Sequence, residues 1–212
     1  MNKTAIVTLA CSLLFLCSDA RSQVFYQYPE APIVKAGEVA IGPYFAVGES
    51  ELFRIGGFVR MNATKHIDVG FELLGDLIEG NGRGGLGADA KLSIFSSYKA
   101  IPFDLSVTGG IGYVTGNDTK IIQAPVGAII SSPFKLERGN ILVPYLGVYL
   151  LIVNTEFDHP SLPDDSDTDF DAELRGGLRY TLSAGPDIFV AGHVGRGEKV
   201  LVGVSFWPRG RD

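Results

Sequence analysis

Residues 103–113 read FDLSVTGGIGY, and the side chains in this stretch alternate in character. Every odd-numbered residue except Gly109 is apolar, whereas every even-numbered residue is charged, hydroxylated or glycine. Successive side chains of a β-strand point to opposite faces, so one face of this segment suits an apolar environment and the other suits water. The segment is therefore predicted to be an amphipathic β-strand.

The same pattern recurs about ten times between Glu38 and Phe206, each time as about ten alternating residues followed by a turn or a polar loop. Strands are predicted, with ends uncertain by about 2 to 4 residues, near 38–48, 53–62, 65–75, 85–97, 102–114, 120–133, 141–153, 170–182, 187–195 and 198–206. This arrangement predicts an all-β fold: a closed antiparallel up-and-down transmembrane β-barrel of about 10 strands. Because Pro125 and Pro144 interrupt two neighbouring apolar runs, 8 strands is the alternative.

The segments outside the barrel have their own character. Residues 1–22 carry an early lysine, an apolar stretch over 5–17 and small residues near 18–22, which predicts a secretory signal peptide. Residues 23–37 contain two prolines and little periodicity, so we expect a periplasmic N-terminal extension there. The barrel is expected over 38–206 and a C-terminal tail over 207–212. Both cysteines, Cys11 and Cys17, lie in the predicted leader, so no disulfide is expected in the mature chain.

The net charge of -6 and the pI near 5.1 argue against a nucleic-acid partner, and the lysines and arginines form no cluster. The apolar stretch of the leader is shorter than the roughly 20 residues that a membrane-spanning helix needs. Any passage through a membrane is therefore expected to be made by strands.

An even number of strands places both chain termini of the barrel on the same side of the membrane. On the other side, the two longest and most polar connections, 75–84 and 154–169, are the expected contact surfaces. Aromatic residues gather where lipid meets water, and a periplasmic girdle is predicted from Phe95, Tyr98, Phe103, Phe134, Tyr180, Phe189, Phe206 and Trp207. A sparser ring on the other side is predicted from Phe45, Phe53, Tyr113 and Phe170.

The polar stripe carries charges of both signs. The residues predicted to point into the lumen and to form an ion-pair network are Asp68, Glu72, Asp89, Lys91, Asp104, Asp171, Glu173, Arg175 and Arg179. The alternative is that they line a small pore. Glycine doublets at 56–57, 109–110 and 176–177 are interpreted as allowing tight curvature or making room for large side chains that cross the lumen.

The most acidic stretch contains spaced carboxylates at Asp165, Asp167 and Asp169, which resemble the start of a calcium-binding loop. Phe170 occupies the position where such a loop requires glycine, so an EF-hand is excluded. A solvated external loop is expected, with a weak divalent-cation site as the alternative. No catalytic residue, resident metal or cofactor is expected.

Two other functions remain open. Alternation does not distinguish inside from outside, so a secreted soluble lipocalin-like barrel that binds an apolar ligand is one alternative. A rim-located outer-membrane lipid hydrolase is the other, because His193 and Glu198 lie close in sequence near an external rim, although no serine stands two residues from His193.

Taken together, the signal peptide, the paired amphipathic strands and the asymmetric loops resemble the small bacterial outer-membrane β-barrel proteins, the group that includes the membrane domain of the OmpA-like proteins. In the last strand Val200, Val202, Val204 and Phe206 alternate as the signal for the barrel-assembly machinery does, but residues 207–212 follow where family members usually end. The resemblance implies an integral protein of the bacterial cell outer membrane with a structural or surface-interaction role, or a narrow channel. It also implies a monomer that is not an enzyme, with outer-membrane lipid and the barrel-assembly machinery as partners.

Overall fold

The computed structural model describes residues 38–48, 52–78, 81–96, 102–116, 119–157, 165–183, 185–195 and 199–207. The predicted signal peptide, the predicted extension and all but the first residue of the predicted tail lie outside these ranges. No helix among the described residues is long and apolar enough to cross a membrane.

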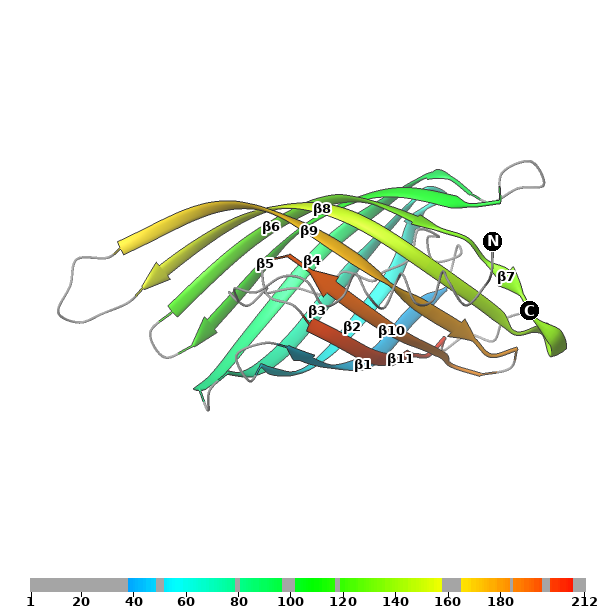
Figure 1. The fold of residues 1–212 in the computed structure, drawn as a ribbon, viewed down its shortest axis with the longest axis horizontal. Helices are drawn as coiled ribbons and strands as arrows, with labels where there is room; N and C mark the ends of the chain where they lie inside the picture. The colour runs from blue at the N-terminus through cyan, green and yellow to red at the C-terminus, as the bar shows by residue number, and fades with distance from the viewer. Residues whose placement is uncertain are drawn as a thin grey trace.

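The described chain is almost entirely strand (Figure 1). The long strands are β1 (Val39–Gly48), β2 (Phe53–Thr64), β3 (Ile67–Ile78), β4 (Asn81–Phe95), β5 (Asp104–Gly116), β6 (Thr119–Ser131), β8 (Ile141–Phe157), β9 (Asp165–Thr181), β10 (Asp187–Val194) and β11 (Lys199–Ser205). A two-residue strand β7 (Phe134–Lys135) and a short 3-10 turn η2 (Glu137–Gly139) lie between β6 and β8.

These strands close into a barrel. Each long strand pairs antiparallel with the next along the chain, β6 pairs with β8, and β11 pairs back onto β1. The short β7 continues the line of β6, because Phe134 lies opposite Leu142 in the register that places Ser131 opposite Tyr145. The wall therefore has ten strands in up-and-down order, so the ten-strand prediction is confirmed and the alternative of eight is wrong.

Both prolines are accommodated where the ladder is interrupted. Between β5 and β6, paired residues stop at Gly109 opposite Val126 and resume in the same register at Gly112 opposite Gln123, with Pro125 in the gap. Proline has no N–H to donate, so the gap in the β5–β6 pairing places Pro125 where the ladder needs no backbone donor. The Pro144 carbonyl accepts the Ser132 N–H at 3.1 Å, beyond the last pair of β6 with β8. One proline thus lies in a gap of the β5–β6 pairing and the other where the β6–β8 pairing ends, so all ten strands remain in the wall.

The apolar stripe faces outward. Leu73 and Leu150 are 70% and 67% exposed, whereas the inward-pointing Arg54, Arg60 and Asp68 are almost fully buried. A soluble ligand-binding barrel would have the reverse arrangement, with apolar side chains inside. The lipocalin-like alternative is therefore wrong for this fold.

The wall is uneven in height. β8 and β9 have 17 residues each, whereas β10 has 8 and β11 has 7. Figure 1 shows β8 and β9 reaching furthest at the left of the view, and we call the end of the barrel where they meet the tall end.

The two connections expected to be long loops at this end are mostly strand. β3 continues to Ile78 and β4 begins at Asn81, while β8 continues to Phe157 and β9 begins at Asp165. The prediction of loops was therefore wrong for 75–78, 81–84, 154–157 and 165–169, because the backbone hydrogen bonds of a ladder do not require apolar side chains. Residues 79–80 and 158–164 lie outside the described residues.

Only some of the residues of the predicted periplasmic girdle lie on the outer face. Phe95, Phe103, Phe134 and Phe206 are exposed on the outer face near one end of the barrel. Phe189 instead points inward and is 1% exposed, and Trp207 packs against the interior cluster that contains it. Tyr98 lies outside the described residues. Of the opposite ring, Phe45, Phe53 and Phe170 are exposed.

Candidate functional site in the barrel lumen

The structure places most of the predicted lumen residues inside the barrel. Six of them are buried: Asp68, Glu72, Lys91, Asp104, Glu173 and Arg175. The side chains of Asp89 and Arg179 are slightly exposed. Asp171 lies nearer the tall end, is partly exposed, and accepts the N–H of Ala172 at 2.7 Å. The alternation of the sequence thus brings charges from β3, β4, β5 and β9 to one interior.

One ion-pair cluster joins β2, β3 and β4. The Arg60 guanidinium donates to the carboxylates of Asp68 and Asp89, on the two strands that follow its own. Lys91 Nζ lies 3.8 Å from Asp68 Oδ2. Two cations are therefore matched with two carboxylates, which is the arrangement that compensates for burying charge.

A second cluster lies closer to the tall end on β1, β2 and β3. Arg54 donates to Asp76 through two bonds, Nε to Oδ1 at 2.5 Å and Nη2 to Oδ2 at 2.6 Å. This fork-to-fork geometry gives both strength and a fixed orientation. The Tyr44 hydroxyl donates to the Glu72 carboxylate across the intervening strand β2.

A third cluster lies on β9, β10 and β11. Glu173 is its centre, because Arg175 Nη2 lies 2.8 Å from Oε2 and His193 Nδ1 lies 2.8 Å from Oε1. The Arg175 guanidinium also stacks over the Tyr149 ring, 4.0 Å from its centroid. Buried Lys199 on β11 lies opposite His193 in the β10–β11 register and so borders this cluster.

At the end of the barrel opposite the tall end, Asp187 holds two partners. Arg179 Nη1 lies 3.1 Å from its Oδ2, and Trp207 Nε1 donates to the same oxygen at 2.9 Å. This bond turns Trp207 toward the lumen and explains why it does not join the outer girdle.

Aromatic rings fill the lumen between the clusters. A contiguous buried group includes Tyr44, Phe58, Tyr145, Tyr149 and Phe189, which come from β1, β2, β8 and β10. Phe58 and Phe189 are in tilted contact with 6.0 Å between ring centroids. Because β2 and β8 lie on opposite sides of the ten-strand ring, this group bridges the lumen from wall to wall.

Inward-facing glycines make space for these rings. A Cβ at Gly56 would overlap the Tyr44 ring, and one at Gly177 would overlap both the Val190 carbonyl oxygen and the Tyr145 side chain. The outward neighbour Gly57 has no such contact, since a Cβ there would meet nothing closer than 3.7 Å. The interpretation of the doublets as room for large side chains therefore holds for one member of each of these two pairs.

Nearer the tall end, one side of the lumen is apolar. Leu74, Val114, Ile121, Leu151 and Val153 form a separate buried cluster on β3, β5, β6 and β8. The charged clusters lie on β1 to β4 and on β9 to β11, so the two sides of the interior differ in chemistry.

Sequence reasoning missed several interior charges: Arg54, Arg60, Asp76, Asp187 and Lys199. A signal was available, because outward Phe53, Ile55, Val59 and Met61 alternate with the two arginines. Phe58 lies between the two arginines on the same inward face, and this apolar residue obscures the alternation of polar and apolar side chains in the sequence.

The predicted cation loop and the predicted hydrolase rim take different forms. Asp165, Asp167 and Asp169 belong to strand β9, and no group of three or more His, Cys, Asp or Glu within the described ranges is arranged to hold a metal ion. His193 faces the lumen and is 2% exposed, so it does not lie on an open rim. Glu198 lies outside the described residues.

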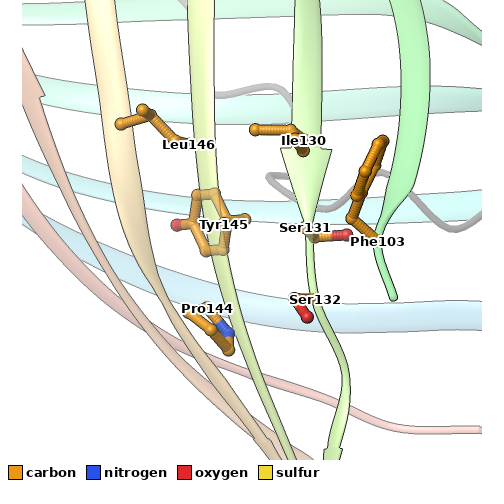
Figure 2. A pocket seen from close by; sticks show the side chains of 7 residues that line it. All are labelled: Phe103, Ile130, Ser131, Ser132, Pro144, Tyr145 and Leu146. Carbon is orange, nitrogen blue, oxygen red and sulfur yellow. The ribbon is translucent and has the colours of Figure 1, made fainter. Parts of the chain in front are cut away.

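One depression of about 300 Å³ lies at the outer surface where β6 separates from β8 (Figure 2). It is lined by Phe103, Ile130, Ser131, Ser132, Pro144, Tyr145 and Leu146. Ser132 Oγ donates to the Pro102 carbonyl at 2.7 Å. The depression follows from the end of the β6–β8 pairing at Ser131 opposite Tyr145 and is continuous with the outward apolar face.

Solved structures with a similar fold are outer-membrane barrels, the group that the sequence resembles. A bacterial polysaccharide outer membrane secretin matches with a TM-score of 0.48 and 12% identity over 81% of this chain, which spans 66% of that chain. The N-terminal β-barrel domain of Pseudomonas aeruginosa OprF matches with a TM-score of 0.38 and 15% identity over 81% of this chain and 98% of that domain. The KdgM porin matches with a TM-score of 0.40 and 11% identity over 79% of this chain and 98% of the porin.

The chain thus spans just under two thirds of the length of the secretin. No protein-family model and no curated protein sequence matches the chain. Likenesses this distant describe a fold and carry no function from one protein to another.

Proposed function

We propose that this chain is an integral β-barrel of the bacterial outer membrane with a structural and surface-interaction role, and that its lumen is closed. The observation that carries the proposal is the division of the wall into an apolar outer face and an interior where charges of both signs lie together. Among the described residues, six cations face seven carboxylates there: Arg54, Arg60, Lys91, Arg175, Arg179 and Lys199, and Asp68, Glu72, Asp76, Asp89, Asp104, Glu173 and Asp187.

The outer face supports placement in lipid. Every long strand carries large apolar side chains on this face, among them Leu73, Val126, Val148 and Leu150. A contiguous apolar surface of this extent is rare on soluble monomers. In lipid, a closed ladder satisfies the backbone donors and acceptors without water, which an open sheet does not. Closure also leaves no free edge within the apolar band, which supports a monomer.

The interior supports a closed barrel more than a channel. A conducting lumen keeps its charged side chains in contact with water, whereas Arg60, Arg175 and His193 are buried and Tyr149 packs against Arg175. In a barrel of this size the side chains nearly fill the interior. The same contacts support a structural role for His193, which faces Glu173, and no catalytic residue or cofactor is part of the proposal.

Outer-face alternation continues to the end of the last strand. Val200, Val202 and Phe206 are exposed, and Phe206 forms a bridge with Ile41 that extends the β11–β1 ladder. We propose that this strand is read by the barrel-assembly machinery.

The test is to express the full chain in a bacterium, isolate the outer-membrane fraction and compare boiled with unboiled samples on a detergent gel. We expect a membrane-extracted band whose mobility changes on boiling, because a closed ladder resists detergent until it is heated. A soluble periplasmic band with unchanged mobility would contradict the proposal.

A further inference from the structure

The depression between β6 and β8 coincides with an interruption of the strand ladder. The β6–β8 pairing ends at Ser131 opposite Tyr145, and β8 pairs again, with β7, further along in the same register. Between these two paired stretches the Ser132 N–H donates to the Pro144 carbonyl, and Pro144 has no N–H with which to return a bond. Paired strand on both sides therefore fixes the place of the depression on the wall.

The depression opens to the apolar outer face. Phe103, Ile130 and Leu146 line it and are exposed on that face, whereas Ser131 and Tyr145 are buried and close its inner side (Figure 2). Its volume of about 300 Å³ is at the lower end of the range for small-molecule pockets. The space therefore suits one hydrocarbon chain and not a folded protein partner.

Basic side chains lie beyond the depression, toward the end of the barrel. Lys135 pairs with Ile141, and Arg138 lies in the short turn η2 between β7 and β8. Both are exposed, as is Glu137 between them, so two cations and one carboxylate leave one positive charge in excess. From Ser132 to Lys135 the chain advances by about 10 Å at the rise of a strand. An apolar space and a positive turn thus follow one another along the wall.

We propose that this depression binds one acyl chain of a membrane phospholipid whose phosphate lies against Lys135 and Arg138. The proposal rests on the proposed function, which places the outer face in lipid, and it adds a fixed lipid position to that face. Surrounding lipid is as apolar as the lining, so burial of the chain by itself gives little preference. Preference comes from the fit of the chain in the depression and from attraction between the phosphate and the cations.

The probe is dioleoyl phosphatidylglycerol, titrated against the delipidated full chain in detergent and counted by native mass spectrometry. We expect one lipid per chain to bind before any other. Ser132→Phe places a ring in the depression and should abolish this first adduct. Ser132→Ala is the matched control, because it loses the same hydroxyl bond to the Pro102 carbonyl but leaves the space open, and it should keep the adduct. Equal adducts in both variants would overturn the proposal.

The charges of the turn are tested separately. The double variant Lys135→Gln, Arg138→Gln should weaken the first adduct, whereas Glu137→Gln should strengthen it, because the two changes alter the charge of the turn in opposite directions. An adduct that responds to neither change would contradict the placement of the phosphate at this turn.

A second measurement uses the unchanged chain and so keeps the test valid if Ser132→Phe folds poorly. Phosphatidylglycerol with a photoreactive diazirine in one acyl chain is added to the chain in lipid vesicles, and the crosslinked peptides are identified. Crosslinks concentrated on 130–132 and 144–146 would support the proposal, and crosslinks spread evenly around the wall would overturn it. The change in gel mobility on boiling the same sample separates an evenly spread result from failure of the chain to form a membrane barrel.

Discussion

At the scale of single residues, the glycines of the inner face are matched to the rings that lie on them. Gly56 and Gly57 are adjacent and chemically identical, yet only Gly56 faces the lumen, where the Tyr44 ring covers it. The sequence shows a doublet without showing which member is covered. The assignment depends on which alternate residues of β2 face the lumen. Buried Arg54 and exposed Ile55 show that the even-numbered residues do.

This difference predicts the effect of adding one methyl group. Gly56→Ala should lower the free energy of unfolding by about 1 to 3 kcal/mol, because the Tyr44 ring has no room to retreat. Gly57→Ala should change it by less than about 0.5 kcal/mol. Urea unfolding in lipid vesicles, followed by the boiled-against-unboiled gel shift, measures both. Equal effects of the two variants would mean that the ring does not lie on Gly56.

Arg60 is the residue on which the β2–β4 cluster depends. Arg60→Met should lower the free energy of unfolding by about 3 to 5 kcal/mol, because it removes the guanidinium that donates to the carboxylates of both Asp68 and Asp89 in the interior. The same urea titration measures it. The triple variant Arg60→Met, Asp68→Asn, Asp89→Asn removes the unmatched charge and should recover part of the loss. No recovery would show that the cost of Arg60→Met arises from packing and not from charge.

At the scale of the strand, alternation predicted the ten elements well where polar and apolar residues took turns strictly, as in β5. It failed where the lumen itself is apolar. Phe58 and Phe189 point inward to meet each other, and Leu151 and Val153 point inward in a strand that is apolar on both faces. Hydrophobicity cannot separate lipid from a packed lumen, so the side of such residues is fixed only by the pairing with neighbouring strands.

β8 offers a test of what surrounds the wall. Leu150 is exposed on the outer face of β8, and Leu150→Arg should lower the free energy of unfolding by about 2 to 4 kcal/mol if that face is in the middle of lipid. Glu156→Arg, an exposed position on the same face toward the tall end, is the depth control and should cost less than about 1 kcal/mol. Unfolding in lipid vesicles gives both values. A negligible cost at Leu150 would place the outer face in water.

At the scale of the whole molecule, two features of the barrel differ in what sequence can predict. Closure followed from the count of strands and their order. The uneven height of the wall did not, because residues such as Asp167 and Thr168 read as loop while pairing as strand, and because the stop at Gly195 depends on its approach to β9 in space. Most of the lumen charges could be predicted because alternate residues keep facing inward along each strand. Their partners across strands could not be predicted, because a long side chain such as that of Arg60 reaches two strands away.

A closed lumen makes a prediction about conductance. The unchanged chain in a planar lipid bilayer should show no steady ion current, because the rings of Tyr44, Phe58, Tyr149 and Phe189 and the ion-paired side chains occupy the interior together. The double variant Tyr149→Ala, Phe189→Ala should conduct, since it removes two rings from mid-lumen and takes away the aromatic face over which Arg175 stacks, so that water can enter beside that charge. Leu73→Ala, on the outer face, is the matched control and should stay silent. Steady current through the unchanged chain, unaltered by the double variant, would mean that ions pass by a route that these rings do not block, and the interior would then have to be regarded as a channel lining.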